Sequence, residues 1–263
     1  NKTGEEPILS LPERHNRILA LLQQFGSISV AQLAERFKVS EVTIRKDLSY
    51  LEQQKKLYRT HGSAILISPY ISDRHVNEKE KRNVAEKRAI GAFAASLIAQ
   101  DDSIIIASGT TVTFLAREIN PAGHLTAITA SVPVTQILSQ CPDVDVIQLG
   151  GITRSSSVSV VGPFAEQMLR SFNCSKLFIG VDGIDTEFGL TTTNMLEASL
   201  NGAMIDAAQK VIVLADSSKF GRRGFSKICD LESVDRIITD SGVQSVYLDR
   251  LRERGIEVTV VDV

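Results

Sequence analysis

Seven short runs rich in Val, Ile and Leu, separated by segments of helical length, most strongly restrict what this 263-residue chain can fold into. The runs span residues 104–108, 126–130, 144–149, 176–181, 211–215, 236–239 and 256–261. Strands that alternate with helices in this way form a largely parallel sheet, which helices cover on both faces. We therefore expect a large α/β domain over residues 83–263.

Residues 8–68 show helical spacing followed by a hairpin pattern. Apolar residues recur at helical spacing from Val30 to Phe37, and Ser40 can cap a second helix after a very short joint. Residues 57–67 then read as strand, turn and strand. Two short helices with a tight joint, followed by a hairpin, are typical of a winged helix-turn-helix domain.

Charge is distributed unevenly along the chain. Residues 1–82 carry 14 Lys and Arg against 10 Asp and Glu, whereas residues 83–263 carry 15 against 21. A basic first domain on an acidic body suggests that the first domain faces a polyanion. Residues 69–82 are charged and poor in apolar side chains, so we expect a charged linker there, with a solvated surface as the plainer interpretation of its charges.

The helix that begins after Ser40 can be divided into a buried stripe of Ile44, Leu48 and Leu51 and an exposed remainder. The candidate DNA-binding residues are Ser40, Val42, Thr43, Arg45, Lys46, Ser49 and Tyr50 on this helix, with Arg59 and His61 on the hairpin. Basic side chains can contact phosphate or guanine, and Val42 can meet a thymine methyl group. An ordinary helix surface is the alternative, and His61 can equally be a structural turn residue.

The sequence gives little sign of metal, disulfide or membrane chemistry. Cys141, Cys174 and Cys229 are widely spaced, and the four histidines are scattered, so we expect neither a disulfide framework nor a zinc site, and no cofactor. The apolar runs are shorter than the roughly 20 residues needed to span a bilayer. The first residues do not read as a secretory leader. We expect a cytoplasmic protein that makes no membrane contact.

Small and polar residues follow several of the predicted strands. Because ligands bind at the carboxyl ends of parallel strands, we expect an effector site there. The candidate effector-binding residues are Ser108, Gly109, Thr110, Thr111, Thr129, Ser131, Gly150, Gly151, Asp182 and Lys219. The loop 108–111 precedes a helix, where backbone N–H groups and hydroxyls can bind phosphate. A plain strand-to-helix turn, an exposed Lys219 and an Asp182 that only caps a turn are the alternatives.

Residues 39–51 and 57–64 resemble the signature of DeoR-type bacterial repressors. The resemblance is carried mainly by Thr43-Ile44-Arg45-Lys46-Asp47-Leu48 and by His61-Gly62-Ser63-Ala64. Where the family pattern has Arg-Arg this chain has Arg45-Lys46, and Ser63 stands where the pattern has glycine. Lys46 cannot form the paired hydrogen bonds to guanine that arginine forms, so we expect a different base preference there. The resemblance implies a winged helix joined to a C-terminal sugar-phosphate sensor.

Residues 178–185, 189–192, 197–198 and 214–221 resemble the sensor of the same family, whose fold is similar to that of pentose-phosphate isomerases and CoA transferases. The resemblance implies that loop 108–111 holds the phosphate with Lys219 as counter-charge. It also implies that Asp182 hydrogen-bonds the sugar hydroxyls and that Gly150 and Gly151 allow the ligand to approach closely. In such isomerases a lysine and a glycine-rich loop follow the aspartates, and residues 189–194 contain neither, which favours binding without turnover.

The sequence therefore predicts a DNA-binding transcriptional regulator. We expect a repressor of a carbohydrate-catabolism operon that a phosphorylated sugar releases from double-stranded operator DNA, acting as a homodimer or homotetramer. One alternative is a sugar-phosphate isomerase-like or CoA-transferase-like enzyme with a basic N-terminal appendage. The other is a winged helix that contacts only proteins.

Overall fold

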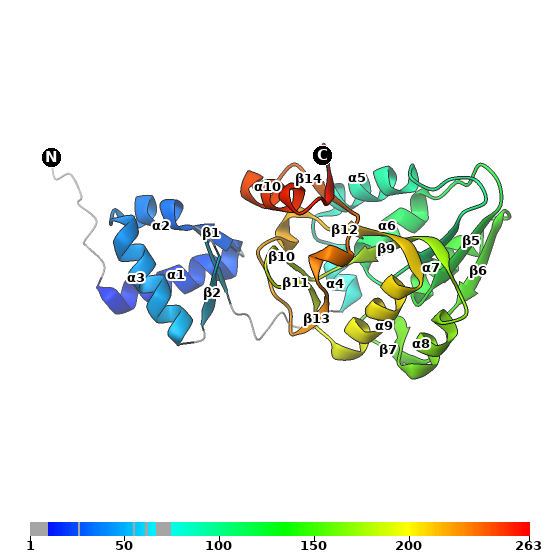
Figure 1. Cartoon of the computed structure of the whole chain (residues 1–263), viewed down its shortest axis with the longest axis horizontal. Coiled ribbons are helices and arrows are strands. Elements are labelled where there is room, and N and C mark those ends of the chain that lie inside the picture. The colour runs from blue at the N-terminus through cyan, green and yellow to red at the C-terminus, as the bar shows by residue number, and fades with distance from the viewer. Residues whose placement is uncertain (1–9, 26, 55, 61–62, 67–74) are drawn as a thin grey trace. The chain divides into compact units, whose positions relative to one another are not determined.

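The computed structural model describes residues 10–25, 27–54, 56–60, 63–66 and 75–263. The chain divides into two compact units, Asn1–Ser68 and Pro69–Val263 (Figure 1).

The first unit consists of three helices and a small antiparallel sheet. The helices are α1 (Leu11–Phe25), α2 (Val30–Phe37) and α3 (Glu41–Gln53), and the strands are β1 (Ser27–Ser29), β2 (Leu57–Thr60) and β3 (Ser63–Leu66). The strand order is β1-β3-β2, so β2 and β3 form the wing that the sequence predicted. The additional strand β1, which the sequence did not predict, pairs with β3 on its other side. The winged helix-turn-helix prediction is confirmed.

Local hydrogen bonds explain the tight joint between α2 and α3. Ser29 and Gln32 form a reciprocal capping box at the start of α2. Lys38 takes the left-handed conformation, with φ 53°, and ends α2. Two residues later the Ser40 hydroxyl accepts a hydrogen bond from the backbone N–H of Thr43 at 3.2 Å and so starts α3. The joint is therefore only three residues long.

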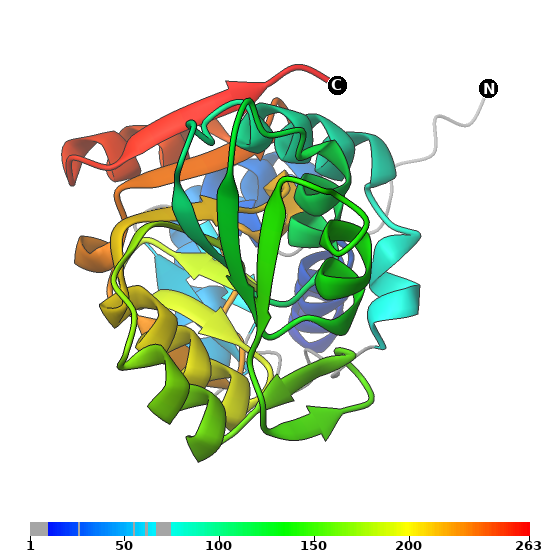
Figure 2. The same ribbon diagram turned by 90° about the vertical axis from the view of Figure 1, so that its right-hand side faces the viewer.

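The second unit is built on a seven-stranded sheet. Its strands are β4 (Ser103–Ile106), β5 (Leu125–Thr129), β6 (Val144–Gln148), β9 (Cys174–Gly180), β12 (Ala208–Leu214), β14 (Arg236–Asp240) and β15 (Glu257–Val261). The order is β15-β14-β12-β9-β4-β5-β6, and every neighbouring pair is parallel. Strand β15, drawn in red, lies at one edge (Figure 2). Each of the seven predicted runs is one of these strands, which confirms the α/β prediction.

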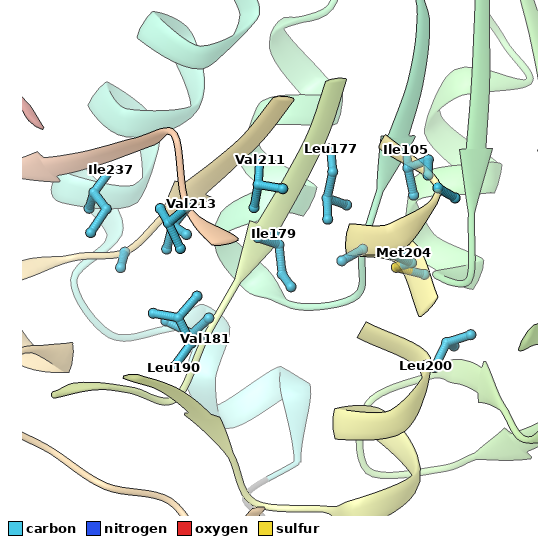
Figure 3. Close-up of a cluster of buried hydrophobic side chains, with 14 of the residues drawn as sticks. Ile105, Leu177, Ile179, Val181, Leu190, Leu200, Met204, Val211, Val213 and Ile237 are labelled. Atoms are coloured by element: carbon cyan, nitrogen blue, oxygen red, sulfur yellow. The ribbon is translucent and has the colours of Figure 1, made fainter. Parts of the chain in front are cut away.

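Helices cover both faces because side chains on each strand alternate between two cores. One core receives Ile104 and Ile106 of β4 and packs against α5 (Val84–Ala95), α6 (Thr110–Glu118) and α7 (Val132–Leu138). The other core receives Ile105 and packs against α8 (Pro163–Leu169), α9 (Met195–Asp206) and α10 (Ser245–Glu253). Figure 3 shows this second core, in which Leu200 and Met204 of α9 lie beside the strand residues.

Two smaller sheets and one short helix were not predicted from the sequence. Strands β7 (Ile152–Arg154) and β8 (Ser159–Val161) form a hairpin, and β10 (Gly183–Asp185), β11 (Gly189–Thr192) and β13 (Ser226–Cys229) form an antiparallel sheet. Two 3-10 turns, Ser217–Lys219 and Leu231–Ser233, complete the unit.

Helix α4 (Val76–Glu80) lies within the segment expected to be a linker. Glu80 pairs with Arg117 of α6 at 2.6 Å, and Lys79 pairs with Asp182 at 2.9 Å. Of the expected linker 69–82, the described part, 75–82, therefore packs against the second unit. Lys79 and Glu80 have partners far away in the sequence, and the side chain of Glu80 is still 39% exposed, so these charges are paired and partly solvated. In the described part of the chain, no helix is long and apolar enough to cross a membrane.

Candidate functional site

Helix α3 presents a basic and partly apolar surface to solvent. Ile44, Leu48 and Leu51 are buried, as the helical spacing predicted. Val42 is 59% exposed and Tyr50 is 50% exposed, and the side chains of Arg45 and Lys46 are exposed as well. An apolar side chain as exposed as Val42 gains nothing from burial within this unit, so it is available for an apolar contact with another molecule.

The remaining predicted DNA-binding residues form hydrogen bonds on the same unit. Arg59 donates to Glu52 at 2.6 Å and to the Ser49 hydroxyl at 2.8 Å, which holds the wing against α3. Arg45 pairs with Glu41 one turn away at 2.8 Å, and both side chains are exposed. Such an exposed pair contributes under about 0.5 kcal/mol and can exchange partners for a phosphate. Ser40 and Thr43 hydrogen-bond each other at 2.9 Å. His61 lies outside the described residues.

Asp47 is a residue that the sequence analysis did not single out for function. It is buried on α3, where Arg14 of α1 donates to both of its carboxylate oxygens, at 2.6 and 3.0 Å. His15 lies 3.1 Å from the same carboxylate, and its ring stacks on Tyr50 with centroids 5.1 Å apart. The hydrogen bonds that Arg14 donates to Asp47 raise the pKa of Arg14 above its ordinary value. This network fixes the orientation of α3 relative to α1.

In the second unit, the carboxyl ends of β4 and β9 meet at the point where the chain order of the sheet reverses. From β4 the chain proceeds outward through β5 and β6, and it then returns to β9 on the other side of β4. Ligands in open α/β sheets bind at such a switch point. A Cβ placed on Gly180 would lie 3.9 Å from the carbonyl oxygen of Ser108, so the two strand ends are in close proximity.

The loop 108–111 follows β4 and starts α6. Gly109 has φ 130°, and a Cβ placed there would meet nothing within 4 Å, so the loop borders open space at this residue. Among the described residues no side chain caps the N-terminus of α6, which leaves its first N–H groups available to an anion. Thr110 and Thr111 are buried, so a contact between their hydroxyls and an effector stays a prediction. The open part of this loop is at Gly109.

Asp182 follows β9 and is held by two donors. The Lys79 ammonium donates to one carboxylate oxygen at 2.9 Å, and the Thr192 hydroxyl donates to the other at 3.0 Å. Burial raises the pKa of Asp182, but the charges of Lys79 and Lys219 and the two hydrogen bonds outweigh burial, so the net pKa lies below its ordinary value. Asp182 is therefore ionised at neutral pH and is more than a cap for the following turn.

Two further lysines, Lys219 and Lys87, lie in this region, and Asp216 is a second carboxylate there. Lys219, which follows β12, lies close enough to Asp182 to lower its pKa. Lys87 of α5 is buried and donates to the backbone carbonyls of Lys79 and Arg82, the latter at 2.6 Å. Burial lowers the pKa of Lys87 to about 8, although the charge of Asp216 opposes this shift. Lys219 is predicted from its place after a strand, whereas Lys79 and Lys87 follow no strand and carry no such signal in the sequence.

Four expected effector residues have local structural roles. Thr129 and Ser131 are fully buried: the Thr129 hydroxyl accepts from the N–H of Ser131, and the Ser131 hydroxyl caps α7. A Cβ on Gly151 would lie 2.6 Å from the carbonyl oxygen of Val161, so this glycine is required by the β7–β8 hairpin. The N–H of Gly150 lies 3.4 Å from the sulfur of Met168. Gly150 and Gly151 are exposed, and an effector contact at these four positions stays a prediction.

Asp185 differs from Asp182 in its surroundings. It is buried, pairs with Arg223 at 2.5 Å, and accepts the backbone N–H groups of Glu187 and Phe188. Its carboxylate therefore stabilises the turn between β10 and β11. The two aspartates of this stretch therefore have different partners.

Both units match described families. Residues 14–70 match the DeoR-like helix-turn-helix domain, and residues 82–241 match the DeoR C terminal sensor domain. The chain belongs to the DeoR family. It is accordingly a DNA-binding transcriptional regulator.

Relatives of similar length carry names of the same kind. The HTH-type transcriptional regulator YulB of Bacillus subtilis is 39% identical, over 95% of this chain and 96% of that protein. The HTH-type transcriptional regulator GlpR of Haloferax volcanii is 34% identical over 95% and 97%. The lactose phosphotransferase system repressor of Streptococcus mutans is 36% identical over 87% and 91%.

Solved structures resemble this DeoR-family chain more distantly. Ribose 5-phosphate isomerase A of Methanocaldococcus jannaschii matches with 16% identity and a TM-score of 0.36, over 55% of each chain. The translation initiation factor eIF-2B of Pyrococcus horikoshii matches with 17% identity and a TM-score of 0.38, over 84% of this chain and 78% of that one. At this level the likeness carries no inference about activity.

Proposed function

We propose that this DeoR-family regulator represses a carbohydrate-catabolism operon and is released from its operator by a phosphorylated sugar. The observation that carries the proposal is the pairing of an uncapped, open helix N-terminus after β4 with an ionised carboxylate, Asp182, after β9, at the switch point of the sheet. The helix N-terminus suits a phosphate, and a carboxylate suits sugar hydroxyls. The lactose phosphotransferase system repressor among the relatives agrees with a sugar-linked role.

The winged helix is the operator-binding part of the proposal. Val42, Arg45 and Lys46 face solvent on α3, and Arg59 joins the wing to the same surface. Two-fold symmetric operators place half-sites about one helical turn, or 34–36 Å, apart, so we propose that the chain acts as a homodimer or homotetramer.

We further propose that the second unit binds its sugar without turnover. A general base works best with a pKa near the operating pH, and the pKa of Asp182 is lowered instead. The second aspartate of this stretch, Asp185, is occupied by Arg223 and by backbone N–H groups. Lys79 supplies a lysine next to Asp182, and it does so from before β4 rather than from the loop where isomerases place theirs.

A thermal-shift screen tests the ligand class. Ribose 5-phosphate, glucose 6-phosphate and fructose 6-phosphate are compared with the unphosphorylated sugars and with inorganic phosphate. A ligand at 100 times its Kd stabilises by about 2.7 kcal/mol, and we expect this from a sugar phosphate only. Mixtures are then analysed for isomerised product. Measurable turnover would favour the enzyme alternative, and stabilisation by the free sugar alone would contradict the phosphate site.

A further inference from the structure

We propose that Lys79 is part of the effector site and that its ion pair with Asp182 is the contact that the effector breaks to release the operator. This inference rests on the proposed function, and it adds the means by which one unit signals to the other. The juxtaposition that carries it is the attachment of α4, the first described segment after the winged helix, to the strand end where the sugar would bind.

Four of the contacts in the described part of the chain connect α4 and its flanks with the rest of the second unit. The N–H of Val76 donates to the carbonyl of Ser156 at 2.7 Å, and Glu80 pairs with Arg117 of α6 at 2.6 Å. Lys87 donates to the carbonyls of Lys79 and Arg82. The Lys79–Asp182 pair is the fourth contact, and of the four it is the one that uses a side chain of the proposed effector site.

The Lys79–Asp182 pair lies where an effector would compete for it. Both oxygens of Asp182 are occupied, one by Lys79 and the other by Thr192. A carboxylate can accept about four hydrogen bonds, but the Asp182 side chain is only 12% exposed, so we infer that a sugar hydroxyl takes the place of one of these donors. Thr192 belongs to β11 and is buried, whereas Lys79 is partly exposed and lies on a short helix, so Lys79 is the donor that moves.

In the proposed effector-bound state, the ligand phosphate becomes the partner of the released ammonium. A phosphate at the N-terminus of α6 brings negative charge to the same switch point, and Lys79 can then pair with it. When the effector binds, Lys79 therefore leaves Asp182 and pairs with the phosphate of the ligand. Because Val76 is only eight residues after Ser68 in the chain, a change in α4 acts on the segment that leads directly to the winged helix.

Lys87 has a positioning role in this arrangement. Its stem is buried in α5, and its ammonium binds the carbonyl of Lys79 itself. Lys87 therefore sets the backbone from which the Lys79 side chain reaches Asp182. Its lowered pKa reflects the same burial.

The test compares Lys79→Met with Lys81→Met in the full-length protein. Both changes remove one positive charge from the same segment, and Lys81 is exposed. Without effector, we expect Lys79→Met to bind a promoter fragment at least about fivefold more weakly than wild type, because the operator-binding arrangement has lost the pair. Lys81→Met should bind as wild type does. Ribose 5-phosphate, glucose 6-phosphate and fructose 6-phosphate should also weaken binding by Lys79→Met less than they weaken wild type.

Asp182→Asn removes the charge of the other partner in the ion pair. It shows whether the effect of Lys79→Met comes from loss of this pair or from an indirect change. If the two residues act through their contact, the double variant should bind the promoter fragment no more weakly than either single variant. Equal operator affinity for Lys79→Met and Lys81→Met would overturn the inference, as would effects of Lys79→Met and Asp182→Asn that simply add. If the wild-type protein does not bind promoter DNA, this result would instead contradict the proposed function, and this inference with it.

Discussion

At the scale of single residues, the fold of the winged helix-turn-helix domain depends on one buried carboxylate, that of Asp47. Asp47 accepts two hydrogen bonds from Arg14, and both side chains are almost fully buried. Asp47→Asn removes the charge that compensates Arg14, and losing one partner of a buried pair costs about 3–5 kcal/mol. We expect the winged helix to unfold at lower temperature, measured by circular dichroism on the full chain. Glu41→Gln, which breaks only the exposed pair with Arg45, should change stability by under about 0.5 kcal/mol.

Gly109 gives a second prediction at this scale. Its φ of 130° is unfavourable for any other residue, and the space beside it is open. Gly109→Val should therefore abolish release by sugar phosphate and leave operator binding intact, since the valine occupies the place of the ligand. Gly255→Val is the matched control, because Gly255 also has a positive φ, 79°, and open space, and it lies before the amino end of β15. If Gly109→Val is still released at wild-type effector concentrations, the loop is not part of the site.

At the scale of elements, Lys87 at the junction of α4 and α5 should make the free energy of unfolding depend on pH, and the direction of this dependence follows from its pKa. The folded pKa of Lys87 is about 8, below its ordinary value of 10.5. The unfolded chain therefore binds more protons than the folded one between these two values, so this lysine makes the fold more stable as pH rises through that window. The difference in unfolding free energy between wild type and Lys87→Met should shift in favour of wild type from pH 7.5 to pH 10. A constant difference over this range would show that Lys87 titrates normally.

The elements that the sequence predicted and those that it missed differ in where their stability comes from. Buried parallel strands consist of consecutive apolar residues, so all seven were visible as runs such as 176–181. The β7–β8 hairpin and the β10-β11-β13 sheet are short, and they depend on pairing between segments up to about forty residues apart. Helix α4 was not predicted because its charged residues are held by ion pairs with Asp182 and Arg117, which are distant in the sequence.

The candidate site shows the same division. Ser108–Thr111, Asp182 and Lys219 were predicted because the ends of parallel strands converge, and the structure places all three near the switch point. Thr129 and Ser131 follow a strand equally well, but their hydroxyls are used by the turn that follows β5. Position at a strand end therefore predicts proximity to a site, and burial decides which side chains remain available.

At the scale of the whole molecule, the positive charge of the winged helix-turn-helix domain should make operator binding depend on salt concentration. Lys46 is exposed on α3, and a lysine that binds a DNA phosphate releases about one counterion. Lys46→Ala should weaken promoter binding and lower the slope of log affinity against log salt by about one unit. Lys210→Ala, which removes an exposed lysine from β12, should leave the slope unchanged. An unchanged slope for both variants would support the alternative in which the winged helix contacts only proteins.

The most direct test of the account is a fluorescence anisotropy titration of a promoter fragment with the purified full-length chain. The titration is carried out at low ionic strength and is repeated with each sugar phosphate and with inorganic phosphate. We expect a Kd of about 10⁻⁸ M or below for a specific site. One sugar phosphate should abolish that binding at a concentration where inorganic phosphate has no effect. Absence of binding to promoter fragments at low ionic strength, or binding that no sugar phosphate changes, would contradict it.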